Sequence, residues 1–469
     1  MYEMSVKTIC EKIWELEDKY GLLHKDIQGV KVWQISRFLI YSEIAQKTGV
    51  FTKPHTTKDS LKDNIKAFPS YFYNAIIKNP LSGNYEKDVL VFDHPRKILV
   101  DGEYIDIYTK YLLDDLEASQ YEVIESPYLS KHFSKNEMHR KYLDRMLLLS
   151  YLYTKISNIK FTTKELNWID SLEYEINSHF NIDLNFKNFF SEWIIQFKCY
   201  YKFYEKLLQK RNPSTIFVVV SYGTYNIPLI SAAKDNDIQV IEIQHGTISP
   251  YHLGYNFPNC NQELAYFPDI FYSFGTYWND IVNFPICKKN IICYGFPYMR
   301  TRKEKYNKAM KKKKQILFLS QGAIGKELAK FVYEAAQVLD EYNIVYKLHP
   351  GEYDRWEKEY NELVLANHLK NVEVISDNKK ELYHYFAESE YQIGVFSTAI
   401  YEGLAFKCKT LLVDLPGIEY MSSLIEKEIV TKVTNVEDLK CQIEFFEPKY
   451  YDEDYFFSEK KNHLAKIKN

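Results

Sequence analysis

The stretch Ile316-Leu317-Phe318-Leu319-Ser320-Gln321-Gly322-Ala323-Ile324-Gly325 decides the fold prediction. Its first four residues form an apolar run that is typical of a buried strand. A polar loop with two glycines follows, and the pattern of residues 326–339 then predicts a helix. Strand, loop and helix in this order begin a β-α-β unit, so we expect parallel strands here.

The same alternation continues through the C-terminal half of the chain. Further strands are expected at residues 344–348, 372–376, 391–396 and 410–414, with helices between them at 353–369, 380–388 and 398–405. Five strands alternating with helices predict an open parallel sheet that is covered on both faces. Ligands of such sheets bind beyond the carboxyl ends of the strands. The residues directly after each strand are therefore the candidates for a site.

The N-terminal half shows a less regular form of this pattern. The apolar run 215–220, the helical pattern 226–234 and the strand pattern 239–244 predict one β-α-β unit. Helices are expected around it at residues 6–20, 32–46, 138–157 and 192–208. We therefore predict an α/β protein of two Rossmann-like domains that face each other across a cleft, with an N-terminal helical elaboration.

The region before residue 130 adds strands to the first domain. A first strand is expected at 88–92, and further strand-like sequence at 116–125. Between them, Asp101-Gly102 lies between two alternating segments and predicts a hairpin within residues 97–108.

A basic stretch separates the two halves. Residues 300–314 hold nine Lys or Arg and one acid, Glu304. We expect a solvated linker helix; the alternative is attraction to an anionic membrane lipid or an anionic glycan. The expected organisation is an N-terminal domain, a basic linker, a C-terminal domain and a final segment that packs back on the first domain, at residues 1–300, 301–314, 315–450 and 451–469.

Composition excludes several classes of protein. The 469 residues carry a net charge of −3, whereas nucleic-acid binders usually show a clear basic excess. Seven cysteines without a Cys-x-x-Cys pair fit free thiols in a reducing compartment. No signal-peptide pattern follows Met1, and no run reaches the roughly 18 apolar residues of a membrane span. We expect a cytoplasmic protein, with peripheral attachment to the inner membrane face as the alternative.

Two loops of the C-terminal half carry groups suited to a phosphate. His349-Pro350 follows a strand and precedes a helix, whose free N–H groups would lie nearby. A histidine there could stabilise a phosphate leaving group, or could be a structural residue at a strand end. Ser397 and Thr398 could cap the next helix or donate to the same phosphate. Glu402, one turn later, could accept hydrogen bonds from a ribose or a base.

The loop Ser320-Gln321-Gly322, with Gly325 after it, resembles a phosphate-cradling loop. The signal is weak, because two glycines at this spacing are common. The sequence has neither Gly-x-Gly-x-x-Gly nor Gly-Lys-Ser/Thr here, which argues against a dinucleotide oxidoreductase and a P-loop enzyme.

Candidate catalytic bases come from the N-terminal half. His245 lies at the end of the strand 239–244, and a histidine can accept a proton from a hydroxyl at neutral pH. Asp101 is the alternative, if the hairpin tip faces the cleft. His94-Pro95-Arg96 follows another strand and could contact an acceptor.

The sequence gives no pattern of metal ligands. Two Asp-x-Asp motifs, Asp235-Asn236-Asp237 and Asp452-Glu453-Asp454, are expected in solvated turns. We therefore expect no metal site and no cofactor.

Three motifs together resemble a known family. Gln244-His245-Gly246-Thr247, Lys347-Leu348-His349-Pro350 and Ser397-Thr398 with Glu402 are similar to motifs of GT-B glycosyltransferases of bacterial capsule and lipopolysaccharide synthesis. Two branches are close: transferases that use CMP-activated sialic acid or Kdo, and CDP-glycerol glycerophosphotransferases. The resemblance covers about residues 215 to 430, and each motif is short.

The resemblance implies an inverting, metal-independent transferase that moves a sugar from a nucleotide donor to a glycan or lipid-linked glycan. By this resemblance Lys347, His349 and Pro350 would hold the donor phosphate, Ser397 and Thr398 would add contacts, and His245 would be the base. A CMP-linked sugar is favoured as the donor, because Ile248-Ser249-Pro250-Tyr251 replaces the continuation usual in the glycerophosphotransferase branch. A sugar-nucleotide epimerase or hydrolase on the same fold is the other alternative.

A second departure from the family's patterns affects the choice of base. The sialyltransferase branch usually has two acidic residues before a glycine, whereas here only Asp101 precedes Gly102. The choice of base therefore stays open between His245 and Asp101.

Overall fold

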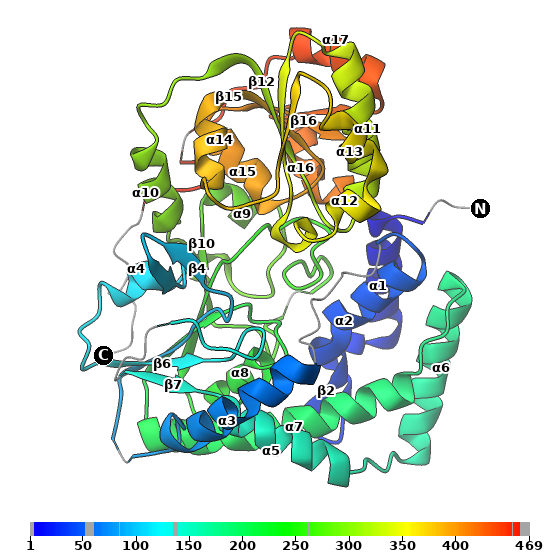
Figure 1. Ribbon diagram of the computed structural model, residues 1–469. Coiled ribbons are helices and arrows are strands. Elements are labelled where there is room, and N and C mark those ends of the chain that lie inside the picture. Colours follow the sequence, from blue (N-terminus) through cyan, green and yellow to red (C-terminus); the bar gives the residue numbers. More distant parts are fainter. Residues whose placement is uncertain are drawn as a thin grey trace.

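The computed structural model describes residues 4–51, 61–83, 85–134, 139–260, 262–452 and 454–459, with residues 61–68 described by their backbone. The chain forms two α/β domains, the N-terminal one below and the C-terminal one above in Figure 1. Each domain is built on a sheet of parallel strands with helices on its faces. The predicted fold class is confirmed: two Rossmann-like domains in the GT-B arrangement.

The N-terminal sheet has the strand order β11-β10-β9-β8-β3-β6-β7, and all its neighbours are parallel. Every residue of β8 is buried, as a strand covered on both faces requires. Two short antiparallel pairs, β1 with β2 and β4 with β5, lie outside this sheet. The strands are β1 Asp26–Ile27, β2 Val30–Lys31, β3 Val89–Phe92, β4 Ile98–Val100, β5 Glu103–Ile105, β6 Tyr121–Glu125, β7 Arg140–Tyr142, β8 Thr215–Val219, β9 Gln239–Ile243, β10 Ile270–Ser273 and β11 Ile291–Cys293.

The C-terminal sheet has the strand order β14-β13-β12-β15-β16-β17, again all parallel. Its strands are β12 Lys312–Leu319, β13 Asn343–Lys347, β14 Val372–Ile375, β15 Ser389–Gly394, β16 Lys409–Val413 and β17 Thr431–Val433. In both sheets the first strand is central, and the chain reverses its direction of winding once. The reversal lies between β3 and β8 in one domain and between β12 and β15 in the other. Ligands of doubly wound sheets bind at this switch point.

Helices cover both sheets and extend the N-terminal domain (Figure 1). The N-terminal half contributes α1 Val6–Tyr20, α2 Val32–Lys47, α3 Leu61–Ile77, α4 Lys110–Leu113, α5 Asp144–Ile156, α6 Thr163–Phe180, α7 Phe186–Arg211, α8 Asn226–Lys234, α9 Thr276–Asp280 and α10 Pro297–Lys305. The C-terminal half contributes α11 Gly325–Val338, α12 Trp356–Glu359, α13 Asn361–Ala366, α14 Leu382–Glu388, α15 Thr398–Ala405, α16 Ser422–Glu426 and α17 Val436–Phe445.

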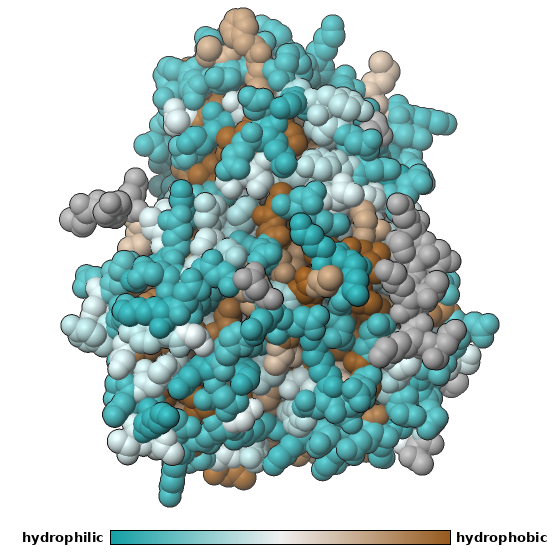
Figure 2. All heavy atoms as spheres, turned by 180° about the vertical axis from the view of Figure 1, so that it is seen from behind, coloured by the Kyte–Doolittle hydropathy of each residue, from teal (hydrophilic) through white to brown (hydrophobic). Residues whose placement is uncertain are grey.

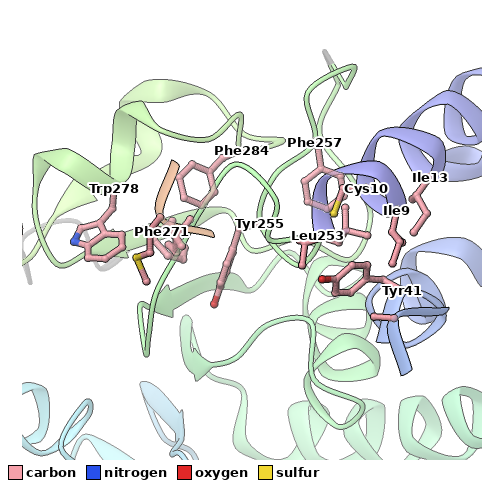
Figure 3. Packing of buried hydrophobic residues seen from close by; sticks show 14 of the residues in the cluster. Ile9, Cys10, Ile13, Tyr41, Leu253, Tyr255, Phe257, Phe271, Trp278 and Phe284 are labelled. Atoms are coloured by element: carbon pink, nitrogen blue, oxygen red, sulfur yellow. The ribbon is translucent and has the colours of Figure 1, made fainter. Parts of the chain in front are cut away.

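The N-terminal helices form the elaboration that the sequence predicts, and they fix one loop of the first domain. Helix α1 begins at a capping box of Ser5 with Thr8, and Gly21 ends it in a left-handed conformation. Buried Arg37 on α2 pairs with Glu17 on α1 and donates to the carbonyl of Asn256 at 3.0 Å. Figure 3 shows the apolar side of this contact, where α1 and α2 pack beside the loop of residues 249–257.

Several elements differ from their expected bounds. Helix α5 begins at Asp144 because Arg140–Tyr142 pairs with β6 as an edge strand; Met138 lies outside the described residues. The helix expected at 353–369 is divided into α12 and α13. Strand β12 begins at Lys312, inside the expected linker, and β17 adds a sixth strand to the C-terminal sheet.

The chain returns to the N-terminal domain after α17. Trp278 Nε1 donates to the Phe456 carbonyl at 2.8 Å, and the Ser458 N–H donates to the Phe274 carbonyl at 2.8 Å. A Cβ on Gly275 would lie 2.5 Å from the Tyr455 carbonyl oxygen, so this segment passes directly over the glycine. We call residues 446–459 the return segment; residues 460–469 lie outside the described residues.

The outer surface is mainly hydrophilic. Seen from behind, apolar atoms show chiefly around the middle of the molecule, where the two domains meet (Figure 2). None of the helices that the structure describes is long and apolar enough to cross a membrane.

Candidate active site

The loop after β9 of the N-terminal domain meets helix α15, which follows the switch-point strand β15 of the C-terminal domain. Thr398, the first residue of α15, accepts a hydrogen bond from the Thr247 N–H at 3.0 Å. The two threonine hydroxyls are also 3.0 Å apart. The structure thus joins two motifs that lie 151 positions apart in the sequence, the His-Gly-Thr loop after β9 and the Ser-Thr pair after β15.

Helix α15 presents its N-terminus and Glu402 to this cleft. Ser397 caps the helix, because its Oγ accepts from the Ala399 N–H at 3.2 Å. Glu402 is half-buried and accepts a hydrogen bond from the Tyr383 hydroxyl at 3.1 Å. Burial raises the pKa of Glu402 to about 7, so a large fraction of this carboxyl is neutral near pH 7. Gly403 lets the helix lie directly on β15, since a Cβ there would be 1.9 Å from Gln392 Oε1.

A buried carboxylate holds the loops after β12 and β13 together. Glu352 accepts from the His349 N–H at 2.8 Å, the Ser320 hydroxyl at 3.1 Å and the Tyr360 hydroxyl at 2.8 Å. Gly325 lies against the same cluster, where a Cβ would be 2.4 Å from Glu352 Oε1. The glycine therefore serves close packing. Glu352 was not predicted, although its position three residues after His349 fits a capping box.

The His349 side chain is oriented by its own loop. Its Nδ1 accepts a hydrogen bond from the Gly351 N–H at 3.1 Å. The neutral ring therefore carries its proton on Nε2, where it can be donated to a ligand. Pro350 begins the 3₁₀ turn Pro350–Glu352 that supplies this N–H. Partial burial, followed by the positive charges of Arg96, Lys347 and Arg355, lowers the pKa of His349. Cations from both domains therefore lie near enough to this ring to affect its pKa, although Arg355 also pairs with Glu359 at 2.9 Å.

Lys347 lies behind His349. Its Nζ donates to the Asp377 carbonyl at 2.8 Å and also contacts the Tyr353 hydroxyl. Burial lowers the pKa of Lys347 to about 8. Lys347 therefore positions the loop and adds positive charge.

The glycine loop after β12 lies beside these groups. Gln321 and Gly322 are half-buried, and the Ile324 N–H donates to the Gln321 carbonyl at 3.0 Å. A Cβ on Gly322 would lie 3.5 Å from Arg355 Nη2, an ordinary contact. Gly322 is thus close to Arg355, one of the cations that affect the pKa of His349.

His245, after β9 of the N-terminal domain, is half-buried and lies between two tyrosines. Its Nδ1 is 3.1 Å from the Tyr255 hydroxyl, and its Nε2 is 3.4 Å from the Tyr222 hydroxyl. The ring lies 6.2 Å from that of His94, which follows β3 at the switch point. Burial, followed by the charges that His94 and His252 would carry, lowers the pKa of His245 to about 3. His245 is therefore neutral.

The tyrosines and the carboxylate around His245 were missed by sequence reasoning. Tyr222 lies three residues after β8, and Glu242 is an acid in a mainly apolar strand, so both had a weak signal. Tyr255 and Tyr108 had none, because loops bring them to the site.

Asp101 lies apart from this group. It occupies the exposed hairpin turn with φ 48°, and its carboxylate pairs with Arg302 at 3.6 Å and Lys305 at 3.9 Å. Three more of the nine cations of the basic stretch form ion pairs: Arg300 pairs with Asp454, Lys312 with Glu388, and Lys314 with Glu341. Five of the nine cations of the stretch thus pair with carboxylates of the chain itself.

Both Asp-x-Asp motifs lie away from the cleft. Asp235 and Asp237 flank the turn after α8, where Asp237 has φ 56°. Asp454 pairs with Arg300, and Glu453 lies outside the described residues. In the part of the chain that the structure describes, no three His, Cys, Asp or Glu side chains are grouped as a metal site needs.

Comparison with known proteins gives similarity of arrangement only. No family model and no curated protein sequence matches the chain. A UDP-GlcNAc 2-epimerase from Methanocaldococcus jannaschii has a TM-score of 0.49 at 11% identity, covering 82% of this chain and 99% of that chain. MurG from Acinetobacter baumannii has a TM-score of 0.44 at 11% identity, covering 77% and 91%. A UDP-GlcNAc 2-epimerase from Neisseria meningitidis has a TM-score of 0.42 at 13% identity, covering 81% and 94%. No activity follows from these values.

Proposed function

We propose that the chain is an inverting, metal-independent glycosyltransferase that moves a sugar from a nucleotide donor to a surface glycan. The observation that carries the proposal is the contact of Thr398 with Thr247. This contact joins the loop of His245, after β9 of one domain, to helix α15 of the other domain, and it supports a base and a donor site on opposite sides of the cleft. A base and a leaving-group site on opposite walls suit in-line displacement, which inverts the anomeric centre.

The donor phosphate would lie at the carboxyl ends of β12, β13 and β15. His349 Nε2–H donates to a phosphate oxygen, and the N-terminus of α15 adds the positive end of its helix dipole. Arg96 and Arg355 supply charge that stabilises the phosphate as it leaves. Glu402 accepts from the hydroxyls of the nucleoside. The acceptor hydroxyl lies on the other side, where His245 accepts its proton.

A CMP-linked acidic sugar is our first candidate for the donor, on the strength of the sequence motifs. A thermal-shift screen of CMP, CDP, UDP and GDP tests this choice. The largest stabilisation with CMP supports it, whereas UDP would indicate a UDP-sugar and CDP would support the glycerophosphotransferase alternative. Stabilisation by none of the four would refute the nucleotide site.

His349→Ala tests the donor side directly. Loss of one preorganised donor to the leaving group should lower turnover by a factor of about 10². His368→Ala, an exposed histidine of the same domain, is the matched control and should retain full turnover. Equal turnover of the two variants would remove His349 from the site.

A sugar-nucleotide epimerase or hydrolase is the second candidate. It is favoured by the position of titratable groups on both walls, with Glu402 on one side and His94 beside His245 on the other. Incubation with the nucleotide sugar alone distinguishes the candidates. An altered or released sugar in the absence of an acceptor would select this second candidate.

We also propose that one face of the N-terminal domain rests on an anionic membrane, where a lipid-linked acceptor would lie. Helix α3 lies against α5 at the foot of the molecule (Figure 1), and both expose large apolar side chains. These are Phe72, Tyr73, Ile76, Ile77, Leu149, Tyr151, Leu152, Tyr153 and Ile156. Exposed cations flank them at Arg145, Lys155 and Lys160. Apolar and aromatic side chains beside Lys and Arg are typical of helices at a lipid interface.

Sedimentation with phosphatidylglycerol and phosphatidylcholine vesicles tests this surface. We expect binding to the anionic vesicles, and its loss in a Leu152→Asp, Ile156→Asp double variant. Phe445→Asp changes an equally exposed apolar residue of the C-terminal domain and should bind like the wild type. A dimer in light scattering that the double variant abolishes would instead make this face an interface between copies.

A further inference from the structure

A chain of hydrogen bonds leads from His245 into the core. Tyr255 is the link: its hydroxyl is 3.1 Å from His245 Nδ1 and 2.7 Å from Glu242 Oε1. Glu242 is fully buried in β9 and also accepts from the Ser221 N–H at 2.9 Å. The chain begins at the cleft and ends on a carboxyl that water does not reach.

The hydrogen-bond partners decide which group donates in each bond of this chain. Glu242 Oε1 already accepts the Ser221 N–H, so it acts as an acceptor and the Tyr255 proton points to it. The Tyr255 oxygen is then free to accept, which requires that His245 carry its proton on Nδ1. His245 Nε2 is left with a lone pair, as a base needs.

The contacts on the Nε2 side of the His245 ring also indicate that its proton is on Nδ1. His252 Nδ1 accepts from the Gly254 N–H at 3.2 Å, so neutral His252 carries its proton on Nε2. That proton points to the Tyr222 oxygen at 3.5 Å, and the Tyr222 hydroxyl points to His245 Nε2 at 3.4 Å. These two contacts are long, so an acceptor hydroxyl can take the place of Tyr222 at Nε2.

We propose that Tyr255 and Glu242 relay the proton that His245 removes, so that it comes to rest on Glu242. The inference rests on the proposed function, in which His245 is the base. The acceptor O–H bond breaks and its proton moves to Nε2; the Nδ1 proton moves to Tyr255, and the Tyr255 proton moves to the Glu242 carboxylate. The acceptor oxygen bonds to the anomeric carbon, and the bond from that carbon to the phosphate breaks with its electron pair on the phosphate.

The relay explains how a poor base can act. A ring whose pKa burial holds at about 3 keeps a proton weakly, whereas burial raises the pKa of Glu242 to about 7. Glu242 Oε2 is also buried and has no hydrogen-bond partner among the described residues. A carboxylate with one unsatisfied oxygen gains more from a proton than a solvated one does. Tyr255 and Glu242 are thus positioning residues that act through His245.

Two readouts test the relay. The first is the nitrogen NMR spectrum of protein labelled with ¹⁵N-histidine, in which the His245 signals are assigned by their loss in His245→Gln. We expect the proton on Nδ1 in the wild type and in Glu242→Gln, whose amide oxygen replaces Oε1. In Tyr255→Phe this preference should be lost. A wild-type His245 that carries its proton on Nε2 would overturn the proposal.

The second readout is kcat, which separates orientation from proton acceptance. Glu242→Gln preserves the tautomer but takes up no proton, so kcat should fall by about 10², as for loss of a general base. Tyr294→Phe removes another buried tyrosine hydroxyl of the same domain and should leave kcat unchanged. Wild-type kcat in Glu242→Gln would overturn the relay. Absence of transfer by the wild type from any nucleotide sugar would refute the proposed function, while the NMR result would still decide the direction of the bonds.

Discussion

The substitution Glu242→Gln should make the fold more stable as the pH rises. Burial raises the pKa of Glu242 from 4.5 to about 7, and each step of one in pKa corresponds to about 1.4 kcal/mol. Ionised Glu242 therefore lowers the free energy of unfolding by about 3 kcal/mol. Because the folded protein keeps this proton to higher pH than the unfolded chain does, wild-type stability falls between about pH 4.5 and 7 and is then constant.

The assay is urea unfolding of both proteins across this range. Glutamine has no proton to lose, so the stability of Glu242→Gln relative to the wild type should increase by about 2 kcal/mol between pH 5.5 and pH 8. Comparing the variant with the wild type at each pH cancels the titration of other groups. It also cancels the constant effect of burying an amide.

Glu357→Gln is the matched control, because Glu357 is exposed on α12. Its stability relative to the wild type should not change with pH. If the relative stability of Glu242→Gln were equally independent of pH, burial would not disfavour the ionised form of Glu242. The reasoning behind its raised pKa would then be refuted.

Three further perturbations have expected outcomes. Gly275→Ala places a Cβ 2.5 Å from a carbonyl of the return segment, so it should destabilise the protein by about 1–3 kcal/mol and speed proteolysis after residue 446. Nucleotide binding by the wild type should tighten by up to about tenfold from pH 6 to 8, as the Glu402 carboxyl with its pKa of about 7 ionises. Glu402→Gln should remove this pH dependence, and equal pH dependence of the two proteins in calorimetry would contradict the expectation. Burial lowers the pKa of His132, but hydrogen bonds to Asp144 and Glu125, both at 2.8 Å, raise it overall. The stabilisation of the fold by charged His132 should be complete below pH 6.5 and decline above it. His132→Gln should therefore lower the free energy of unfolding by about 3 kcal/mol at pH 6 and by less at pH 9.

The helices and strands could be predicted where the local sequence pattern indicates the same element that the tertiary structure contains. The strands of the C-terminal domain are buried on both faces, so apolar runs mark them to within a few residues. Helix α1 was predicted with its observed bounds, because its cap and its apolar face are both local. Strand β7, Arg140–Tyr142, could not be predicted, since only pairing with β6 makes it a strand.

The candidate site, too, could be predicted only in part from the sequence. His349 and Thr398 follow strands, so the parallel-sheet rule brings them to one edge without further information. The sequence could not show that Thr398 contacts Thr247, because domain orientation decides that contact. Nor could it show Tyr255 beside Glu242, since this pairing depends on the loop 249–257 and the buried Arg37 that holds it.

The return segment has a consequence for building hybrid enzymes from exchanged halves. A single splice in the basic linker would leave residues 446–459 attached to the incoming C-terminal half. These residues complete the other half: Trp278 and Phe274 bond their backbone, and Gly275 leaves room for them. A working hybrid therefore needs a second junction, after α17, so that the N-terminal half keeps its own return segment.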